Sequence, residues 1–227
     1  MKFLYSDTQD YVDPGYDFLN DRNAPGRKRY WDDRYAHEMM DAAPYDGLLV
    51  SMSAVKQTVG GNPSGGRYSP AEAQRFLRDG ARKFLRFAGP KFGDKMLMGD
   101  CGAFAYADQE KPGFTPEEVF EFYADAGFTH GCSPDHIIFD FDAANPPASA
   151  ISQAVLARYD ITLENARLFL RLTEQEGRPF EPLGAVQGWS PESMANASVA
   201  LEKLGHRYLA AGGPVPLRPA LFADILK

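Results

Sequence analysis

Short apolar segments alternate with capped helical segments along most of this chain. Each apolar segment has the length and composition of a β-strand, and the run at 47–52 is apolar without interruption. A continuous apolar run is typical of a strand that is covered on both faces, as in a parallel sheet. Repeated strand–helix units predict right-handed crossovers and therefore an α/β fold. The expected strands cover residues 2–5, 47–52, 96–99, 136–139, 183–188 and 207–210.

The helices between these strands are marked by their first residues. Ser69-Pro70-Ala71-Glu72 and Thr115-Pro116-Glu117-Glu118 each combine a capping box with a proline at the first helical position. A long helical region is expected from about residue 149 to 176, with a restart at which Thr162 caps the second part. Two further helices are expected, from Ser190 to Leu204 and from about Leu217 to the end.

The order of the elements favours a TIM-type (β/α) barrel over a dinucleotide-binding fold. No glycine-rich dinucleotide fingerprint follows the strand at 47–52. A complete barrel has eight strands in about 250 residues, whereas this chain has 227 residues and five to six visible βα units. We therefore expect an irregular or incomplete barrel in a single domain over residues 1–227. Residues 1–46 are irregular but rich in aromatic side chains, which predicts an ordered N-terminal arm packed on the barrel.

The composition limits the classes of partner. A net charge of −7 argues mildly against a broad nucleic-acid-binding surface, although Arg27-Lys28-Arg29 and Arg82-Lys83 with Arg86 could form local basic patches or merely solvated faces. No apolar run is long enough to cross a membrane and no signal peptide is visible, so a cytoplasmic location is expected. The two cysteines make no disulfide framework, and Cys132 has the character of an inert core thiol.

Polar residues follow four of the expected strands. They are Asp100, the Asp135–Asp142 segment, Gln187 with Gly188, and Gly212-Gly213. A parallel barrel brings all these strand ends to one face, where such folds carry their chemistry. Carboxylate, carboxamide and bare backbone N–H groups together suit a flat heterocyclic ligand. Taken alone, Asp100 is better explained as the cap of a loop or a helix start through backbone N–H groups, and the later polar strand ends reverse this preference.

These segments resemble the guanine transglycosylase superfamily, the base-exchange enzymes of the tRNA-guanine transglycosylase type. The family's Asp-Ser-Gly-Gly-Phe-Gln segment corresponds to Asp100-Cys101-Gly102-Ala103-Phe104-Ala105, and its Gly-Ile-Val-Gln-Gly-Gly segment to Gly184–Gly188. Its base-binding strand followed by prolines is similar to 133–140 with Pro146-Pro147, and its Gly-Gly turn to 212–213. The order and spacing match across about residues 95 to 215. The stretch at 7–14 resembles the branch that inserts 7-deazaguanines into DNA.

The resemblance implies an enzyme that replaces guanine in DNA or tRNA with a 7-deazaguanine such as 7-cyano-7-deazaguanine. Asp100 would be the general acid/base near the glycosidic nitrogen. Asp135 would bind the N1–H and amine edge of the base, Gln187 and the Gly213 backbone would hold the ring carbonyl, and Phe104 would stack on the base. The implied substrate-binding residues are Asp135, Gln187, Gly212, Gly213, Phe104 and Cys101.

Two family features are not found in this sequence. The family nucleophile lies well after the Gly-Gly turn, beyond Lys227, and two cysteines cannot supply the family zinc site, so we expect no metal and no cofactor. An alternative is a non-catalytic base-binding subunit of a split enzyme, with a partner chain or a second copy covering the open sheet edge. A third alternative is a metal-dependent barrel hydrolase that uses Asp100, Asp135, Asp140 and His136.

Overall fold

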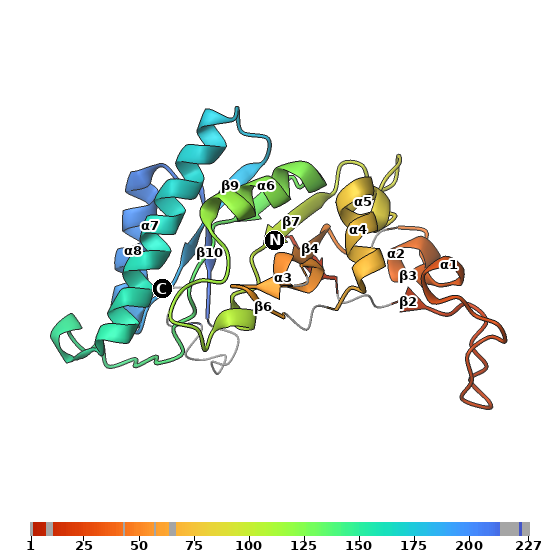
Figure 1. The fold of residues 1–227 in the computed structure, drawn as a ribbon, viewed down its shortest axis with the longest axis horizontal. Helices are drawn as coiled ribbons and strands as arrows, with labels where there is room; N and C mark the ends of the chain where they lie inside the picture. Colours follow the sequence, from red (N-terminus) through yellow and green to blue (C-terminus); the bar gives the residue numbers. More distant parts are fainter. Residues whose placement is uncertain are drawn as a thin grey trace.

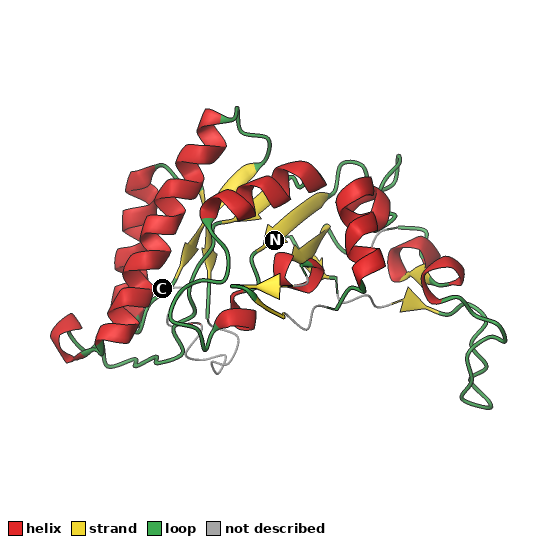
Figure 2. Cartoon of the chain, viewed as in Figure 1, coloured by secondary structure: helices red, strands yellow, loops and turns green. Residues whose placement is uncertain are grey.

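A six-stranded parallel sheet organises the computed structural model of the chain, which describes residues 2–7, 11–42, 44–56, 58–63, 67–213 and 223. The strands lie in the sheet in the same order as in the chain, and each pairs in parallel with its neighbours (Figures 1 and 2). The α/β class and the parallel sheet are thus confirmed. The strands are β1 (Leu4–Ser6), β4 (Gly47–Ser51), β7 (Met96–Asp100), β8 (His130–Cys132), β9 (Glu181–Val186) and β10 (Tyr208–Ala211).

The sheet is curled into a half-barrel with its main helices along one side. A strand order without reversal means that every right-handed crossover passes on the same side of the sheet. Neighbouring helices accordingly touch in chain order, α4 with α6, α6 with α7, and α7 with α8 (Figure 1). This winding is that of a barrel and differs from a doubly wound sheet, in which the order reverses. The helices are α4 (Pro70–Asp79), α6 (Pro116–Ala126), α7 (Gln153–Gln175) and α8 (Pro191–Leu204).

Burial alternates along the central strands and separates the two faces of the half-barrel. Val50 and Leu97 are fully buried. Leu49 and Met98 point the other way and are only half-buried. Successive side chains of a strand lie on opposite faces, so the helix-covered face forms the core and the inner face is partly open. The candidate site described below lies on this inner face.

The strand that the sequence predicts at residues 136–139 is wrong. The strand lies at His130–Cys132, whereas residues 136–139 belong to no strand. The backbone N–H of His136 donates to Thr162 Oγ1 (3.0 Å) and that of Ile138 donates to Gln187 Oε1 (3.1 Å). Side-chain oxygens thus accept the hydrogen bonds that a neighbouring strand would accept in a sheet. The apolar pattern of the sequence cannot reveal such partners.

Two of the expected helices also differ in detail. The region after Ser69 divides into α4 and α5 (Ala81–Phe84) at Gly80, whose φ of +78° ends the first helix. Helix α7 runs without a break from its cap at Ser152, so the expected restart is wrong. Thr162 is buried within it and donates to the Arg158 carbonyl (2.8 Å). Helices α6 and α8 begin at the predicted caps, while the helix expected from Leu217 falls outside the described residues except for residue 223.

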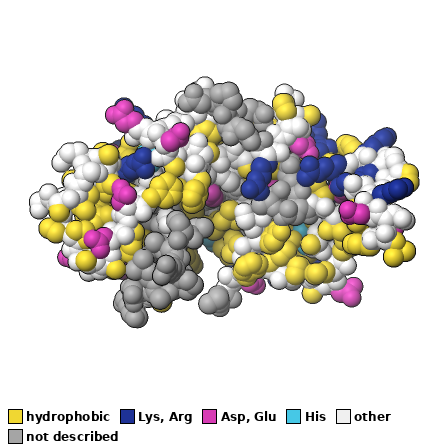
Figure 3. Space-filling model, turned by 90° about the horizontal axis from the view of Figure 1, so that it is seen from below, with side chains coloured by type: hydrophobic (Ala, Val, Ile, Leu, Met, Phe, Trp, Pro, Cys, Tyr) yellow, Lys and Arg dark blue, Asp and Glu magenta, His cyan; other side chains and the backbone are white. Residues whose placement is uncertain are grey.

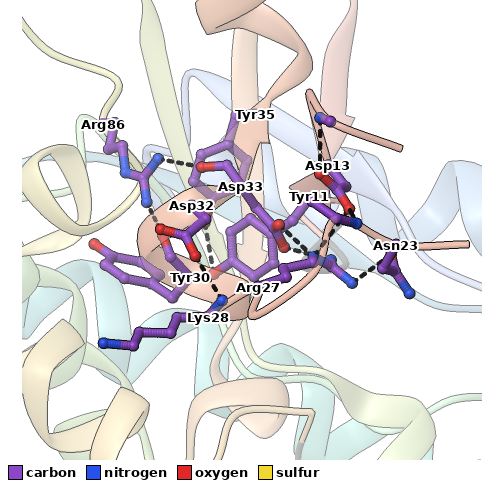
Figure 4. Close-up of polar contacts among 12 residues, drawn as sticks. Tyr11, Asp13, Asn23, Arg27, Lys28, Tyr30, Asp32, Asp33, Tyr35 and Arg86 are labelled. Atoms are coloured by element: carbon purple, nitrogen blue, oxygen red, sulfur yellow. Dashed lines mark hydrogen bonds and ion pairs between the residues drawn. The ribbon is translucent and has the colours of Figure 1, made fainter. Parts of the chain in front are cut away.

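A polar network holds the N-terminal region together, and its aromatic side chains pack on the half-barrel. Arg27 forms a bidentate pair with the buried carboxylate of Asp33 (2.5 and 2.6 Å) and also lies 3.8 Å from Asp13 (Figure 4). Tyr35 is 5% exposed and belongs to the main core. The remaining short elements are β2 (Tyr11–Val12), α1 (Arg29–Asp32), β3 (Arg34–Tyr35), α2 (Ala36–Met39), α3 (Met52–Val55), β5 (Thr58–Val59), β6 (Asn62–Pro63), η1 (Ala103–Tyr106) and η2 (Ala148–Ala150).

Candidate active site

A pocket of about 300 Å³ lies on the inner face, at the carboxyl ends of the strands. Its wall is formed by residues from β4, β7, η1, the segment after β8, β9 and the end of β10. Five of the seven residues that the sequence singled out line this one pocket, namely Asp100, Phe104, Asp135, Gly212 and Gly213. Cys101 and Gln187 lie directly behind it, hydrogen-bonded to Asp135.

Asp100 ends β7 and is held by the turn that follows it. Gly102 has a φ of +79°, and a Cβ there would lie 1.9 Å from Ser53 Oγ, so only glycine fits this close approach. The Asp100 carboxylate accepts hydrogen bonds from the Ser51 side chain and from the backbone of residues 101 and 102. Burial, together with the neighbouring Asp135 charge, nevertheless raises the pKa of Asp100 to about 6. The capping bonds are therefore present, and the carboxyl group also faces the pocket.

Asp135 is 7% exposed and is fixed on both oxygens. Gln187 Nε2 donates to Oδ2 (2.6 Å) and Cys101 Sγ donates to Oδ1 (3.2 Å). The Tyr106 hydroxyl donates to the Asp135 backbone carbonyl (3.0 Å) and so ties the residue to η1. Burial raises the pKa of Asp135, and the hydrogen bonds from Gln187 and Cys101 oppose this shift. Each carboxylate oxygen keeps a lone pair for a further donor from the pocket.

Gln187 and Cys101 support Asp135 from behind the pocket. Gln187 is 1% exposed, and its Oε1 accepts from the Ile138 N–H while one N–H of its amide donates to Asp135, which leaves one N–H. Cys101 is fully buried, and burial raises the pKa of its thiol well above the usual range. The thiol is therefore protonated and acts as a hydrogen-bond donor.

The Gly212-Gly213 turn brings bare backbone to the same place. The Gly212 N–H donates to the Val186 carbonyl (2.8 Å), which extends the β9–β10 pairing. A Cβ on Gly212 would lie 2.3 Å from Gln187 Nε2 and 3.0 Å from Asp135 Oδ2. A side chain at this position would push into the Asp135–Gln187 pair, so the small residue keeps the pocket open.

Two exposed aromatic rings lie together at the pocket. Phe104, on η1, is 58% exposed and contacts Phe139, which is 48% exposed, with a ring-centroid distance of 5.9 Å. The sequence singled out Phe104 but treated Phe139 as a strand residue. Neither ring is covered by the described residues, so each can offer a face to a planar ligand.

The residues of the metal-dependent alternative do not converge. His136 is fully buried away from the pocket, with Nε2 against the Gln109 carbonyl (2.8 Å), and Asp140 is exposed outside it. In the described part of the chain, no group of three or more His, Cys, Asp or Glu side chains could hold a metal ion. The structure therefore gives the hydrolase alternative no support.

Three residues near the pocket were not anticipated from the sequence. Ser51 and Tyr106 hold Asp100 and the Asp135 backbone, and hydroxyl groups of this kind carry no distinguishing sequence signal. Asp7 follows the short strand β1 and is buried, with the Tyr68 hydroxyl donating to it (2.5 Å). It is a further strand-end carboxylate, although it does not line the pocket.

The two carboxylates of this parallel half-barrel lie at the carboxyl ends of its strands, which is the end at which α/β barrels carry their active sites. The chain is 38% identical over 231 aligned positions to a protein named DNA-guanine transglycosylase from Salmonella montevideo. The alignment covers all of this chain and 52% of that relative, so the chain spans about half of the relative's length. The resemblance to the guanine transglycosylase family is thus confirmed over the whole of this chain.

No family model matches the chain. In the described ranges, no helix has the length and apolar character that a membrane crossing requires.

Proposed function

We propose that this chain carries the base-binding pocket of a guanine transglycosylase that acts on DNA, within a TIM-type barrel. The convergence of Asp100, Asp135 and the 212–213 turn on one pocket carries the proposal, because these groups were selected from separate sequence segments. The name of the relative favours DNA over tRNA. The incoming base would be a 7-deazaguanine such as 7-cyano-7-deazaguanine.

The pocket offers a distinct group to each edge of a guanine-like base. In its carboxylate form, Asp135 accepts the N1–H and the exocyclic amine. We assign the ring carbonyl to the backbone N–H of Gly213 in the pocket wall and to the second N–H of Gln187 directly behind it, and Phe104 stacks on the ring. Cys101 serves by holding Asp135 in position. A base can reach this pocket only when it has left the helical stack.

Asp100 is suited to move the proton at the glycosidic nitrogen. A general acid/base works best when its pKa is near the working pH, and a pKa of about 6 leaves both forms of Asp100 populated near neutrality. The protonated form would give its proton to the guanine nitrogen as the bond from that nitrogen to the sugar C1′ breaks and the family's aspartate nucleophile bonds to C1′. The resulting carboxylate then takes the proton from the incoming base, which restores the starting state.

Calorimetric titration of the protein with 7-cyano-7-deazaguanine tests the pocket. Asp135→Ala should abolish saturable binding, because the paired donors of the base lose their acceptor. Asp140→Ala removes an equal charge from an exposed position outside this pocket and is the matched control. Equal affinity in the Asp135 variant and the wild type would contradict the assignment.

One observation favours the alternative of a binding subunit without its own nucleophile. Asp100 and Asp135 are the only carboxylates that line the pocket among the described residues, and both already have roles in handling the base. The alternative predicts base binding without exchange by this chain alone. Mass spectrometry of nucleosides from guanine-containing DNA incubated with the base separates the two: the formation of deazaguanine nucleoside shows exchange.

A further inference from the structure

A second cleft, separate from the base pocket, lies between the N-terminal arm and helix α4. It has a volume of about 670 Å³ and is lined by Lys28, Arg29, Trp31, Arg75 and Arg78, among others. Glu72 is the single acidic residue in its lining, and its carboxylate is already engaged in the cap of α4 at Ser69. A chain with a net charge of −7 thus concentrates four cations around one cleft. We call this feature the arm cleft.

Several basic residues bind groups of the protein itself, and these include Arg78 at the cleft, which pairs with Asp79 (2.8 Å). Arg27 pairs with Asp33, and Arg86 donates to the Asp33 carbonyl (2.8 Å) and to the Tyr30 carbonyl (Figure 4). Arg82 donates to three backbone carbonyls in residues 87–95. The sequence could not separate these roles, whereas the structure places Lys28 and Arg75 in the lining of the arm cleft with no ion pair among the described residues.

Arg75 is the central residue of the arm cleft. Its guanidinium group lies 3.5 Å from the ring centre of Tyr30 and 4.9 Å from that of Trp31. Its Nε is buried without a hydrogen-bond partner, and no ion pair to Arg75 occurs among the described residues. Aromatic rings hold this cation in place without neutralising it, so the guanidinium can bind an anionic ligand that enters the cleft.

Trp31 adds an aromatic surface to these charges. Its side chain is 70% exposed at the edge of the cleft. Lys28 is exposed on the same rim. Arg78 lies one turn beyond Arg75 on α4 and pairs with Asp79 (2.8 Å). A positive groove beside an exposed aromatic ring is the arrangement by which proteins bind single-stranded nucleic acid, with phosphates on the cations and a base on the ring.

The topology places one end of the arm cleft at the same edge of the sheet as the base pocket. Helix α4 follows β4 in a crossover, so its first turn, which includes Ala71 in the cleft lining, lies on the side of the strand carboxyl ends. Figure 3 shows the molecule from below, with the Lys and Arg side chains gathered on the side of the N-terminal arm. A strand that leaves the base pocket can therefore continue towards the arm cleft.

We propose that the arm cleft binds the backbone of an unpaired stretch of the DNA substrate, with Arg75 and Lys28 on phosphates and a base stacked on Trp31. The inference rests on the proposed function only for the choice of DNA as the polyanion. It assigns the N-terminal arm a role in holding the strand, while the base pocket handles the exchanged base.

Fluorescence anisotropy with a labelled oligothymidylate tests the arm cleft by itself, because this strand has no guanine for the base pocket. Arg75→Gln combined with Lys28→Gln should weaken binding about ten-fold at low salt and reduce the slope of log K against log salt by about 1.4, or about 0.7 for each lost phosphate contact. The matched control is Arg171→Gln with Lys203→Gln, which removes the same charge from α7 and α8. Equal losses in both double variants, or no loss in the first, would overturn the proposal.

Trp31 provides a second readout that does not depend on the arginine variant folding well. The chain has two tryptophans, and Trp189 is only 8% exposed, so Trp189→Phe leaves Trp31 as the single reporter. Saturable quenching by oligothymidylate is expected, and Trp31→Ala should weaken binding several-fold. Unchanged fluorescence on saturation would contradict the stacking. Inorganic phosphate is tested as a third ligand. If phosphate alone quenched Trp31 equally, or displaced oligothymidylate, the cleft would be a small-anion site and the DNA assignment would be overturned.

Failure of this inference can be distinguished from failure of the proposed function. Free 7-cyano-7-deazaguanine carries no phosphate, so Arg75→Gln should leave its calorimetric affinity unchanged while Asp135→Ala abolishes it. If the wild type binds the free base and the cleft variants bind oligothymidylate as tightly as the wild type, only the arm-cleft proposal is rejected. If the wild type does not bind the free base, the proposed base pocket is rejected. The anisotropy experiment then still tests whether the arm cleft binds DNA.

Discussion

Gln187 donates a 2.6 Å hydrogen bond to the carboxylate of Asp135, a residue 52 positions earlier in the chain. Through its other end the same amide accepts the Ile138 N–H (3.1 Å). The Gln187 side chain thus orients the carboxylate that we propose binds the base. It also provides a hydrogen-bond acceptor for the backbone of the segment after β8. Because both contacts are buried, the amide oxygen and nitrogen cannot exchange places without losing both.

Gln187→Leu should therefore destabilise the fold as well as the pocket. The substitution leaves the Ile138 N–H and an Asp135 oxygen buried without partners, which costs about 2–4 kcal/mol of unfolding free energy. Gln187→Glu should be as harmful above the pKa of Asp135, since two carboxylates would then face each other. Urea unfolding measures both variants. Gln175→Leu, on an exposed position at the end of α7, is the control and should change stability by less than about 0.5 kcal/mol.

Asp100→Asn should change how stability depends on pH. The pKa of Asp100 is about 6 in the folded chain against an ordinary 3.8. Between these values the folded state binds more protons than the unfolded state, so the contribution of Asp100 to stability is complete below pH 3.8 and is lost as pH rises through about 6. The variant should show a flatter profile across this window and be about 1–3 kcal/mol more stable at pH 8. A profile identical to the wild type would contradict the raised pKa.

The same variant separates binding from exchange. An asparagine keeps the size of Asp100 but cannot carry the proton, so affinity for the free base should remain within a few-fold while any base exchange is lost. Asp140→Asn, in an exposed segment, should keep both properties. Exchange that persists in Asp100→Asn would show that this carboxyl group only caps the turn at residues 101 and 102.

Gly212→Ala tests the space in front of the Asp135–Gln187 pair. The new methyl group would lie 2.3 Å from Gln187 Nε2, which forces that amide or the turn to move. We expect base affinity to fall at least about ten-fold and unfolding free energy to fall by about 1–3 kcal/mol. Gly15→Ala, in an exposed turn of the arm, is the matched substitution and should leave the calorimetric affinity unchanged. Wild-type affinity in Gly212→Ala would show that the turn is not part of the base site.

The elements that the sequence located best are those with strong local signals. Capping boxes with proline located the starts of α4 and α6, the Ser190-Pro191 pair located the start of α8, and the apolar run at 47–52 located β4. Five of the selected site residues could be brought to one pocket because strand ends in a parallel sheet share an edge. These inferences needed only local pattern and general topology.

What the sequence could not supply depends on long-range contacts. The apolar residues at 136–139 have strand composition, yet their N–H groups pair with the side chains of Thr162 and Gln187. Threonine often caps helices, yet Thr162 lies in the middle of α7, where its Oγ1 accepts a hydrogen bond from the His136 N–H. For the same reason a run of basic residues does not reveal which side chains are bound to carbonyls and which face a cleft.

Arg82 gives a direct test of that last distinction. It belongs to the second basic run of the sequence, but its guanidinium donates to the carbonyls of Phe87 (3.3 Å), Phe92 (3.1 Å) and Lys95 (2.6 Å), which fixes the segment leading into β7. Arg82→Met keeps much of the side-chain volume but removes all three bonds, so unfolding free energy should fall by about 2–4 kcal/mol in urea titrations. Lys83→Met, on the neighbouring 76%-exposed side chain, should cost less than about 0.5 kcal/mol. At a temperature where both variants are folded, neither should weaken oligothymidylate binding beyond the small effect of one lost surface charge. A ten-fold loss in Arg82→Met would place the DNA contact at this run and remove it from the arm cleft.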